Sequence, residues 1–400
     1  MKLSLILKNP TETLLYMERM VNDGSPSGFS FINTTTKHTC PFYVDKFEVN
    51  QIIDYEDKFV TVGDLEKIEN NNIFDFVYVH PDWRLYNSIL DIRKTGKFVI
   101  PTSSSRTVKD ISNDFYIKMA YPGILGRINR DLGLKQIYAS YDVNNILYKL
   151  ILDEDVPPAL AFLPEIGGKC YKNNNCEIGY VLRKFEPVGK NTYRIKAQIP
   201  AFSLFSKDIK SDDEPIIIQL LREQTNIYEY LFNQLFFPII DCYFFCIFCG
   251  GIQPEMHSQN FLIGIDDMYN ICSIILRDLE SVDKDITIME QINSFPHLKS
   301  YPYKCICKEQ YNYRIKHSFM YDHKLGEYFF DPLISCLSEN NIIDKCKTQK
   351  IIKNYVTDKY GNKIFNFFPE DKKWYKFDSV LVNRDEDFRP YISNPNPKYR

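Results

Sequence analysis

The stretch GGIQPEMHSQNFLIGIDDMYNICSIILRD, residues Gly250–Asp278, sets a dense group of polar side chains among apolar segments. The apolar segment before it, Leu235–Cys249, runs into two glycines, as a buried helix ends at a glycine C-cap. FLIGI and ICSII then predict two strands around a polar DDMYN turn. With the turn centred near Met268, the antiparallel hairpin is expected to bring Asn260 and Asp278 together at its open end.

A carboxamide and a carboxylate at one end of a hairpin suit a magnesium ion that holds nucleotide phosphates. Such ions take oxygen ligands, usually one or two carboxylates with phosphate oxygens completing the shell. Glu255 and His257 lie just upstream and belong to the same polar group. From these residues alone, a polar loop that merely closes a hairpin remains the alternative.

A second hairpin is predicted where GKFVIPTSSSRTVKDISNDFYIKMAY, residues 96–121, turns on DISND. With this turn near Ser112, Arg106 is expected directly opposite Lys118, with Ser104 two residues along. Two cations beside hydroxyls on one sheet face would hold a polyphosphate. Because like charges opposite each other destabilise an empty hairpin, we expect an anion between them. The alternative is a solvated sheet face.

Composition bounds the class of protein. With 400 residues, 44% of them hydrophobic, the chain can bury a sizeable core, most simply as two or three subdomains. A net charge of −3 argues against nucleic-acid binding through bulk charge. The N-terminus is a poor signal peptide, and the apolar segment Leu235–Cys249 carries Pro238 and Asp241 and is too short to span a bilayer. We expect a soluble, cytoplasmic protein without a membrane partner.

Eleven cysteines are an odd count for a disulfide framework and favour a reducing compartment. Cys242, Cys246 and Cys249 lie in the apolar helix pattern, so we interpret them as buried thiols rather than metal ligands. His317 and His323 lack the spacing of a helical metal pair and are interpreted as surface or rim residues.

Three further segments are assigned from local patterns. The Gly/Asn-rich segment 165–176 is interpreted as a turn, because its GGK is too short for a phosphate-binding P-loop. Residues 213–235 predict one amphipathic helix with Pro215 in its first turn. The tail YISNPNPKYR, residues 391–400, is expected to be frayed. Arg183, on a predicted strand, is a weaker candidate for a phosphate or substrate contact.

Taken in order, HPDW (residues 80–83), TSSSRT (102–107), the Lys118…Arg130 segment, EMHSQN (255–260) and LRD (276–278) resemble motifs of the IucA/IucC family. These are siderophore synthetases that work independently of nonribosomal peptide synthetases. Order and approximate spacing match over residues 75–390. The resemblance implies an α/β (α+β) fold with a kinase-like palm, antiparallel sheet and hairpins, and a mostly helical C-terminal portion.

The expected division has three parts: a reduced N-terminal subdomain over residues 1–70, an ATP-phosphate-binding sheet subdomain over 71–200, and a palm with the magnesium and catalytic hairpin, followed by the helical portion, over 201–400. Two departures from the family stand out. Gly126 replaces the usual threonine four residues before Arg130, and the N-terminal H-P-x-H-P-x-x-K segment is missing. The resemblance therefore leaves open either a reduced subdomain or a drifted substrate specificity.

Residue by residue, the resemblance implies a site for ATP, Mg²⁺ and a carboxylic acid. Arg130 would bind the substrate carboxylate and stabilise the acyl-adenylate, and His257 would lie beside the reacting carboxyl group and the α-phosphate. Gln259 would support the metal shell. The ATP phosphates would be held by Ser104, Arg106, Thr107 and Lys118, and the magnesium ion by Glu255, Asn260 and Asp278.

The implied activity is an ATP-dependent ligase reaction that releases AMP and pyrophosphate. The chain would adenylate a small, citrate-like polycarboxylic acid and condense it with an amine or hydroxyl nucleophile, in siderophore biosynthesis. A homodimer is expected from the resemblance only. Two alternatives stay open: a kinase-like phosphotransferase that releases ADP, although no Gly-rich phosphate loop or H-R-D segment is present, and a non-catalytic binding protein descended from the enzyme.

Overall fold

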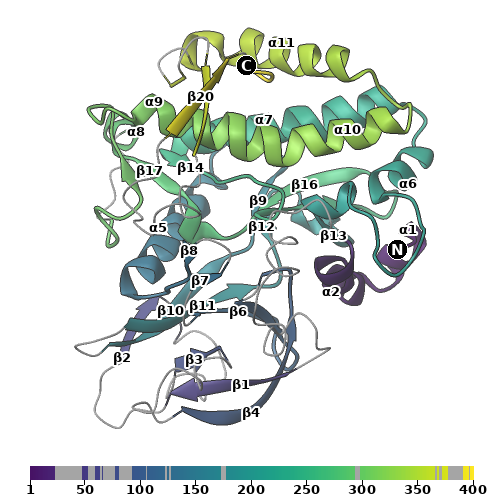
Figure 1. Ribbon diagram of the computed structural model, residues 1–400. Helices are drawn as coiled ribbons and strands as arrows, with labels where there is room; N and C mark the ends of the chain where they lie inside the picture. Colours follow the sequence, from purple (N-terminus) through teal and green to yellow (C-terminus); the bar gives the residue numbers. More distant parts are fainter. Residues whose placement is uncertain are drawn as a thin grey trace.

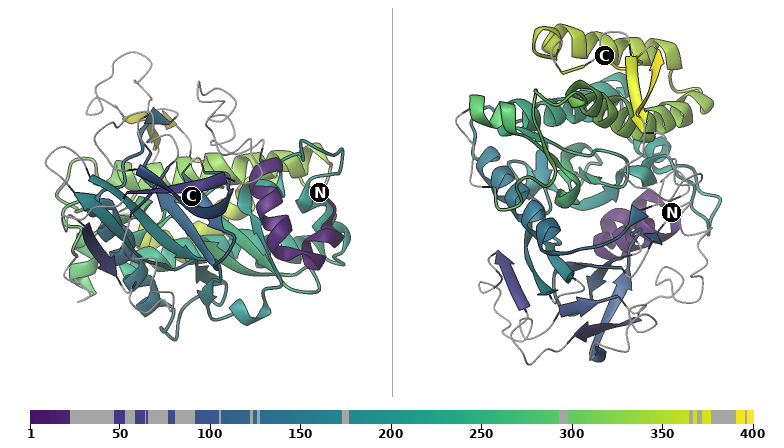
Figure 2. Two further views of the ribbon diagram at one scale, coloured as in Figure 1. Left: turned by 90° about the horizontal axis from the view of Figure 1, so that it is seen from below. Right: turned by 60° about the vertical axis from the view of Figure 1, so that its left-hand side comes forward.

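The computed structural model describes residues 1–22, 47–52, 59–63, 65, 77–80, 92–104, 106–121, 124–125, 128–172, 177–292, 298–364, 367–368, 372–376, 391–395 and 397–400. In Figure 1 an eight-stranded sheet forms the lower part of the molecule, a five-stranded sheet lies in the middle, and long helices form the upper part. The turned view on the right of Figure 2 keeps this order. This mixed α/β arrangement agrees with the predicted fold class.

The eight-stranded sheet has the order β2-β10-β11-β6-β5-β4-β1-β3, and all its neighbouring strands pair antiparallel. The helix α5 (Leu134–Leu150) packs on β10 and β11. Ile137 shares one apolar cluster with buried residues of the sheet such as Ile178 and Tyr180 of β11. The strands are β1 (Phe47–Ile52), β2 (Phe59–Gly63), β3 (Val77–Val79), β4 (Ile92–Pro101), β5 (Thr107–Asp110), β6 (Phe115–Met119), β10 (Glu165–Lys172) and β11 (Glu177–Lys184).

The five-stranded sheet contains the predicted C-terminal hairpin. Its order is β12-β9-β16-β15-β13, and every residue of β15 (Phe261–Ile265) and β16 (Ile271–Leu276) is buried, as continuous apolar strands require. The hairpin turns near Met268 as predicted, since Phe261 pairs with Leu276, and the amide of Arg277 donates to the carbonyl of Asn260 at 2.9 Å, which places Asn260 and Asp278 at the open end. A bulge at Gly264/Ile265 makes the turn asymmetric. The other strands are β9 (Leu160–Phe162), β12 (Val188–Gly189) and β13 (Ala197–Pro200).

Short elements complete the structure. Two N-terminal helices, α1 (Leu3–Lys8) and α2 (Pro10–Met20), precede the sheets, and α2 packs against β13. The remaining strands are β7 (Ile124–Leu125), β8 (Ile128–Asn129), β14 (Ile252–Gln253), β17 (Asp283–Asp285), β18 (Cys305–Ile306), β19 (Lys372–Lys376) and β20 (Tyr391–Pro395), and the 3₁₀ turns are η4 (Thr192–Arg194), η5 (Ala201–Leu204) and η7 (Leu279–Ser281).

The helical layer is built around α7 (Phe237–Gly250), which ends where Gly251 adopts the left-handed conformation, as predicted. The single helix predicted over residues 213–235 is wrong. Pro215 instead precedes the short α6 (Ile216–Arg222), and a separate π-helical segment η6 (Glu229–Phe236) leads into α7. The other helical elements are α8 (Ile286–Gln291), α9 (Tyr313–Ser318), η8 (Phe319–Phe330), α10 (Asp331–Glu339) and α11 (Lys345–Ile364).

The helix formed by η6 and α7 is longer than its apolar sequence predicted. The helix, Glu229–Gly250, is long and apolar enough to cross a membrane by length and composition alone. In the fold, however, 61% of its most apolar 18-residue stretch is buried. Asp241 in this helix accepts hydrogen bonds from Tyr355 and Tyr360 of α11, at 2.9 and 2.6 Å. The helix therefore forms the core of the helical layer, with its charged group bound by a neighbouring helix.

The thiols of the apolar helix only partly follow the prediction. Cys242 and Cys246 are buried, and burial raises the pKa of both thiols. Cys249, one turn further, is exposed. Among the residues that the structure describes, no cluster of three or more metal-ligating His, Cys, Asp or Glu side chains occurs.

Two other local predictions are wrong. His317 is fully buried rather than on the surface, because its ring lies between Gln253 of β14 and Asp285 of β17, at 2.8 and 3.1 Å. The tail is also not frayed where the structure describes it. Tyr399 is buried and donates to Asp331, while the Arg400 guanidinium lies 2.8 Å from a carboxylate oxygen of Asp322.

Segment 165–176 is mainly a strand rather than a turn, since β10 covers Glu165–Lys172 in the middle of paired neighbours. Gly167 and Gly168 allow the neighbouring strands β2 and β11 to approach β10 closely. A Cβ on Gly168 would lie 1.9 Å from the carbonyl oxygen of Tyr180 in β11. Gly167, at φ 138°, occupies a conformation that other residues rarely adopt.

We expect Gly168→Ala to destabilise the protein by more than about 2 kcal/mol, because β10 and β11 must separate to admit the methyl group. Urea denaturation measures this change. Gly361→Ala in α11 is the matched control, since its nearest neighbouring atom would lie 3.9 Å away, and it should stabilise by about 0.5–1 kcal/mol. A wild-type midpoint for Gly168→Ala would contradict the close packing of these strands.

Candidate functional site

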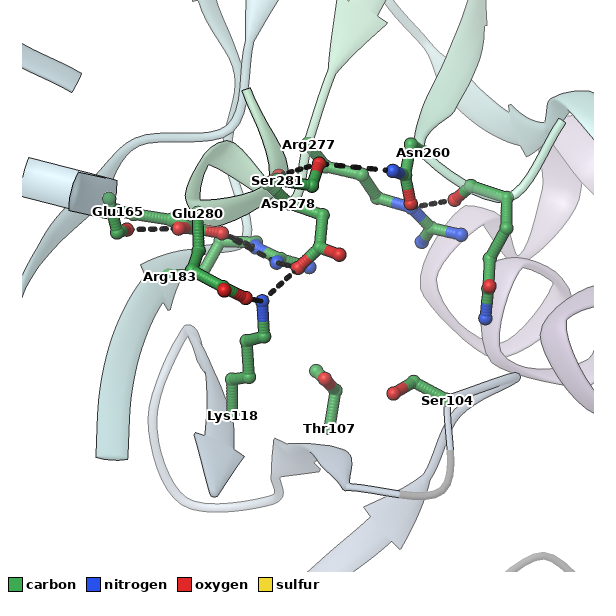
Figure 3. Close-up of polar contacts among 12 residues, drawn as sticks. Ser104, Thr107, Lys118, Glu165, Arg183, Asn260, Arg277, Asp278, Glu280 and Ser281 are labelled. Atoms are coloured by element: carbon green, nitrogen blue, oxygen red, sulfur yellow. Dashed lines mark hydrogen bonds and ion pairs between the residues drawn. The ribbon is translucent and has the colours of Figure 1, made fainter. Parts of the chain in front are cut away.

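The candidate site lies where the β5–β6 hairpin faces the open end of the β15–β16 hairpin. Figure 3 shows Ser104, Thr107 and Lys118 on one side and Asp278 and Asn260 on the other. The ammonium of Lys118, a buried residue of β6, forms an ion pair with Asp278 and lies 3.2 Å from Oε2 of Glu280. The two predicted hairpins are therefore joined directly by charge.

The register of the β5–β6 hairpin differs from the prediction by one residue. Thr107, not Arg106, lies opposite Lys118, because the turn is centred between Ser112 and Asn113. Arg106 precedes β5, and its amide donates weakly to the hydroxyl of Ser104, at 3.5 Å.

From this position Arg106 still reaches Glu280, which also binds Lys118. Its guanidinium donates to the main-chain carbonyls of Arg130 and Asp131, each at 3.1 Å, and lies 3.4 Å from Oε2 of Glu280. Arg106 and Lys118 thus converge on one carboxylate oxygen.

The anion expected between the two cations is the side chain of Glu280. Besides Lys118 and Arg106, the hydroxyl of Tyr303 binds it, donating to Oε1 at 2.9 Å. Burial would raise the pKa of this carboxyl group, but the positive charges of Lys118 and Arg106 lower it overall. An internal carboxylate therefore lies at the position where the sequence predicts phosphate binding.

A second ion-pair chain fixes Asp278 from the other side. Arg183 of β11 lies 2.5 Å from Glu165 and 3.2 Å from Oδ1 of Asp278. Although burial opposes ionisation, Lys118 and Arg183 hold the pKa of Asp278 well below its usual range. Arg183 is thus an internal partner of two carboxylates, which accounts for its full burial on a strand.

Among the described residues, hydrogen bonds and ion pairs to the carboxylate of Asp278 reach only Oδ1, which leaves Oδ2 for another ligand. Both contacts from Lys118 and Arg183 are made by Oδ1, and the side chain is 30% exposed, in a left-handed residue that lies between β16 and η7. Asn260 donates to Ser281 at 3.3 Å, which orients its amide beside Asp278. A carboxylate oxygen and an amide oxygen suit a magnesium ion whose remaining ligands are phosphate and water oxygens.

The third predicted metal ligand is held differently. Glu255 forms a 2.7 Å ion pair with Lys324 of η8, and the charge of Lys324 lowers the pKa of Glu255 to about 2 although burial opposes this. Asp278 and Asn260 therefore fit a metal ion more directly than Glu255 does. Gln259 lies beside this group, and its side-chain amide is 3.5 Å from the hydroxyl of Ser103.

His257 is a neutral imidazole at pH 7. Burial lowers its pKa to about 4, against the opposing charge of Glu255. Nδ1 accepts a hydrogen bond from the amide of Gln259 at 3.2 Å, so the neutral ring carries its proton on Nε2 and can donate there.

Arg130 belongs to the same electrostatic group. Burial and the charge of Arg106 lower its pKa, while Asp278, Glu280 and Glu255 act in the opposite direction. Gly126, the position where a departure from the resembled family was noted, lies outside the described residues. His80, of the first resembled segment, is buried with its ring edge-on to Tyr121 at 4.8 Å, in keeping with a structural role.

Several residues of this site escaped the sequence analysis. Glu280 follows Asp278 by two positions in LRDLE, and its closeness to a predicted ligand was the available signal. Glu165 lay in a segment assigned to a turn. Glu18 of α2 is fully buried, and Leu14, Leu15 and Met17 of the same helix are also buried. A charged residue on an apolar helix face was the signal there.

No protein-family model matches this chain, and no curated protein matches it in sequence. Solved structures do match. The petrobactin biosynthesis protein AsbB from Bacillus anthracis str. Sterne superposes with a TM-score of 0.76 at 14% identity, covering 96% of this chain and 74% of AsbB.

Two aerobactin synthetases from a hypervirulent pathotype of Klebsiella pneumoniae are also similar. ATP-bound IucA has a TM-score of 0.67 at 12% identity and covers 90% of this chain and 71% of IucA. IucC has a TM-score of 0.67 at 13% identity and covers 91% of this chain and 72% of IucC. The fold implied by the motifs is thereby confirmed.

We expect Glu280→Gln to strengthen the binding of inorganic pyrophosphate about tenfold, or about 1.4 kcal/mol, because Lys118 and Arg106 lose a competing internal anion. Isothermal titration calorimetry measures the dissociation constant. Glu290→Gln, at an exposed position of α8, removes the same charge away from the site and should leave binding unchanged. Equal or weaker binding by Glu280→Gln would show that Glu280 does not occupy the phosphate position.

Proposed function

We propose that this chain is an ATP-dependent synthetase that adenylates a carboxylate of a small, citrate-like polycarboxylic acid and joins it to an amine or hydroxyl nucleophile, in siderophore biosynthesis. The observation that carries the proposal is the convergence of Lys118 and Arg106 on one anion beside Asp278 and Asn260. The likeness in fold to ATP-bound IucA supports it. In the proposed division of the chain, residues 71–200 supply the phosphate contacts and residues 201–400 supply the metal ligands.

The ATP phosphates would replace the carboxylate of Glu280 between Lys118 and Arg106. A polyphosphate carries more charge than one carboxylate and offers more acceptor oxygens, so it competes well for the same cations. The hydroxyls of Ser104 and Thr107 lie on the same side as Lys118 and would donate to further phosphate oxygens.

Asp278 and Asn260 would hold the magnesium ion, with Glu255 nearby and Gln259 supporting the group. When bound, the ion neutralises charge on the phosphate oxygens and favours the departure of pyrophosphate. Lys118 and Arg183 keep Asp278 ionised and oriented for this role, because both bind its Oδ1.

In the proposed first step, a carboxylate oxygen of the acid attacks the α-phosphorus of ATP. The new O–P bond forms as the bond from the α-phosphorus to the bridging oxygen breaks, and pyrophosphate leaves. Arg130 would bind the acid's carboxylate, and Nε2–H of the neutral His257 would donate to an oxygen near the α-phosphate. An amine or hydroxyl then attacks the acyl carbon, AMP leaves, and an amide or ester results.

The products of ATP turnover test this proposal. The protein is incubated with MgATP, a panel of polycarboxylic acids and hydroxylamine as a surrogate nucleophile. Acid-dependent AMP, pyrophosphate and hydroxamate are the expected products. ADP would instead indicate a kinase-like phosphotransferase, and ATP binding without turnover of any acid in the panel would favour a binding protein.

Asp278→Asn should reduce the rate of AMP release at least 100-fold, about 2.7 kcal/mol in transition-state stabilisation, and should abolish its dependence on magnesium concentration. The physical reason is the loss of the anionic oxygen that would bind the metal. Asp266→Asn is the matched control, because it removes a carboxylate from the turn end of the same hairpin, where Asp266 binds Arg194 at 2.8 Å. Magnesium-dependent turnover in Asp278→Asn would remove the metal assignment.

A further inference from the structure

We infer that Glu18, a residue of the N-terminal helix α2, is a positioning residue that holds the phosphate-binding segment and the metal-binding hairpin at a fixed separation. This inference rests on the proposed function. It concerns a part of the chain in which the sequence shows no chemistry. In the described part of the structure, the side chain of Glu18 binds Arg277 and Ser103, neither of which is proposed to bind ATP or magnesium.

Glu18 carries a charge into the protein interior, since its side chain is fully buried. A buried carboxylate is costly unless it is paired and hydrogen-bonded. Both of its oxygens are used in this way. Oε1 forms an ion pair with the buried guanidinium of Arg277, and Oε2 accepts a hydrogen bond from the amide of Ser103 at 3.1 Å.

These contacts close a ring of four residues. Nε of Arg277 donates to the carbonyl of Gln259 at 2.7 Å, and the side-chain amide of Gln259 lies 3.5 Å from the hydroxyl of Ser103. The ring therefore runs from Glu18 through Arg277, Gln259 and Ser103 back to Glu18. It joins α2, the turn before β5, and the two segments that flank the β15–β16 hairpin at its open end.

Each ring member outside α2 is the chain neighbour of a residue proposed to bind ligand. Ser103 precedes Ser104 of the phosphate group, whereas Gln259 precedes Asn260 and Arg277 precedes Asp278 of the metal group. Main-chain geometry transmits a shift of one residue to the next. Glu18 thus sets how far the phosphate-binding hydroxyl of Ser104 lies from the metal-binding oxygens, which belong to a different sheet.

A purely structural ion pair would stabilise the fold without affecting ligand binding, and a control pair separates the two roles. Asp322 and Arg400 form a similarly buried pair in the helical part, with side chains 2% and 5% exposed. The hydrogen bonds between these two side chains join η8 to the C-terminal residue and include no member of the ring. Asp322→Asn therefore matches Glu18→Gln in chemistry and burial but not in location.

The experiment measures the dissociation constant of MgATP by calorimetry and the thermal midpoint for four proteins: the wild type, Glu18→Gln, Asp322→Asn and the double variant Glu18→Met/Arg277→Met. The double variant replaces both charges by apolar side chains, a change that buried pairs often tolerate without loss of stability. We expect at least tenfold weaker MgATP binding in both Glu18 variants and wild-type binding in Asp322→Asn.

Each result decides the matter. Weaker binding in a folded Glu18 variant, with Asp322→Asn unchanged, supports a positioning role, because general destabilisation would affect the control equally. Wild-type affinity in a folded Glu18 variant would overturn the inference while leaving the proposed function intact. A wild-type protein that binds no MgATP would overturn the proposed function itself, and with it the inference.

Discussion

The ammonium of Lys118 joins the eight-stranded sheet to the hairpin of the five-stranded sheet, and the geometry of the site depends on this contact. Burying an unpaired charge costs several kcal/mol, and two carboxylates, Asp278 and Glu280, face the buried ammonium of Lys118. Removing one partner of such a pair typically costs about 3–5 kcal/mol. The groups that connect the two sheets are thus also those proposed to bind phosphate and metal. The same charges therefore contribute both to the stability of the fold and to the proposed ligand binding.

Much of the fold follows from local patterns in the sequence. The apolar strands of the C-terminal hairpin and the glycine end of α7 were predictable, because burial and the left-handed conformation of Gly251 each leave a clear signal. The strand β10 was not predictable in this way. Glycines at positions 167 and 168 are typical of a turn, and only the structure shows that the close approach of neighbouring strands requires them. His317 was misjudged for a similar reason, since its partners come from distant strands.

The candidate site was predicted in composition more than in geometry. The β5–β6 hairpin was placed one residue out of register, because the exact turn is set by tertiary packing, whereas the turn of the β15–β16 hairpin lies near Met268 as predicted. The sequence motifs indicated cations and metal ligands but not the carboxylates that neutralise them. Glu18, Glu165 and Glu280 pair with those cations across long stretches of chain. Pairings of this kind leave no periodic signal in a single sequence.

A crystal structure of the protein with magnesium and a non-hydrolysable ATP analogue tests the central claim most directly. The account predicts phosphate oxygens between Lys118 and Arg106, the carboxylate of Glu280 displaced from both, and the metal ion bound by Asp278 and Asn260. A nucleotide bound elsewhere, with Lys118 and Arg106 still paired to Glu280, would contradict it.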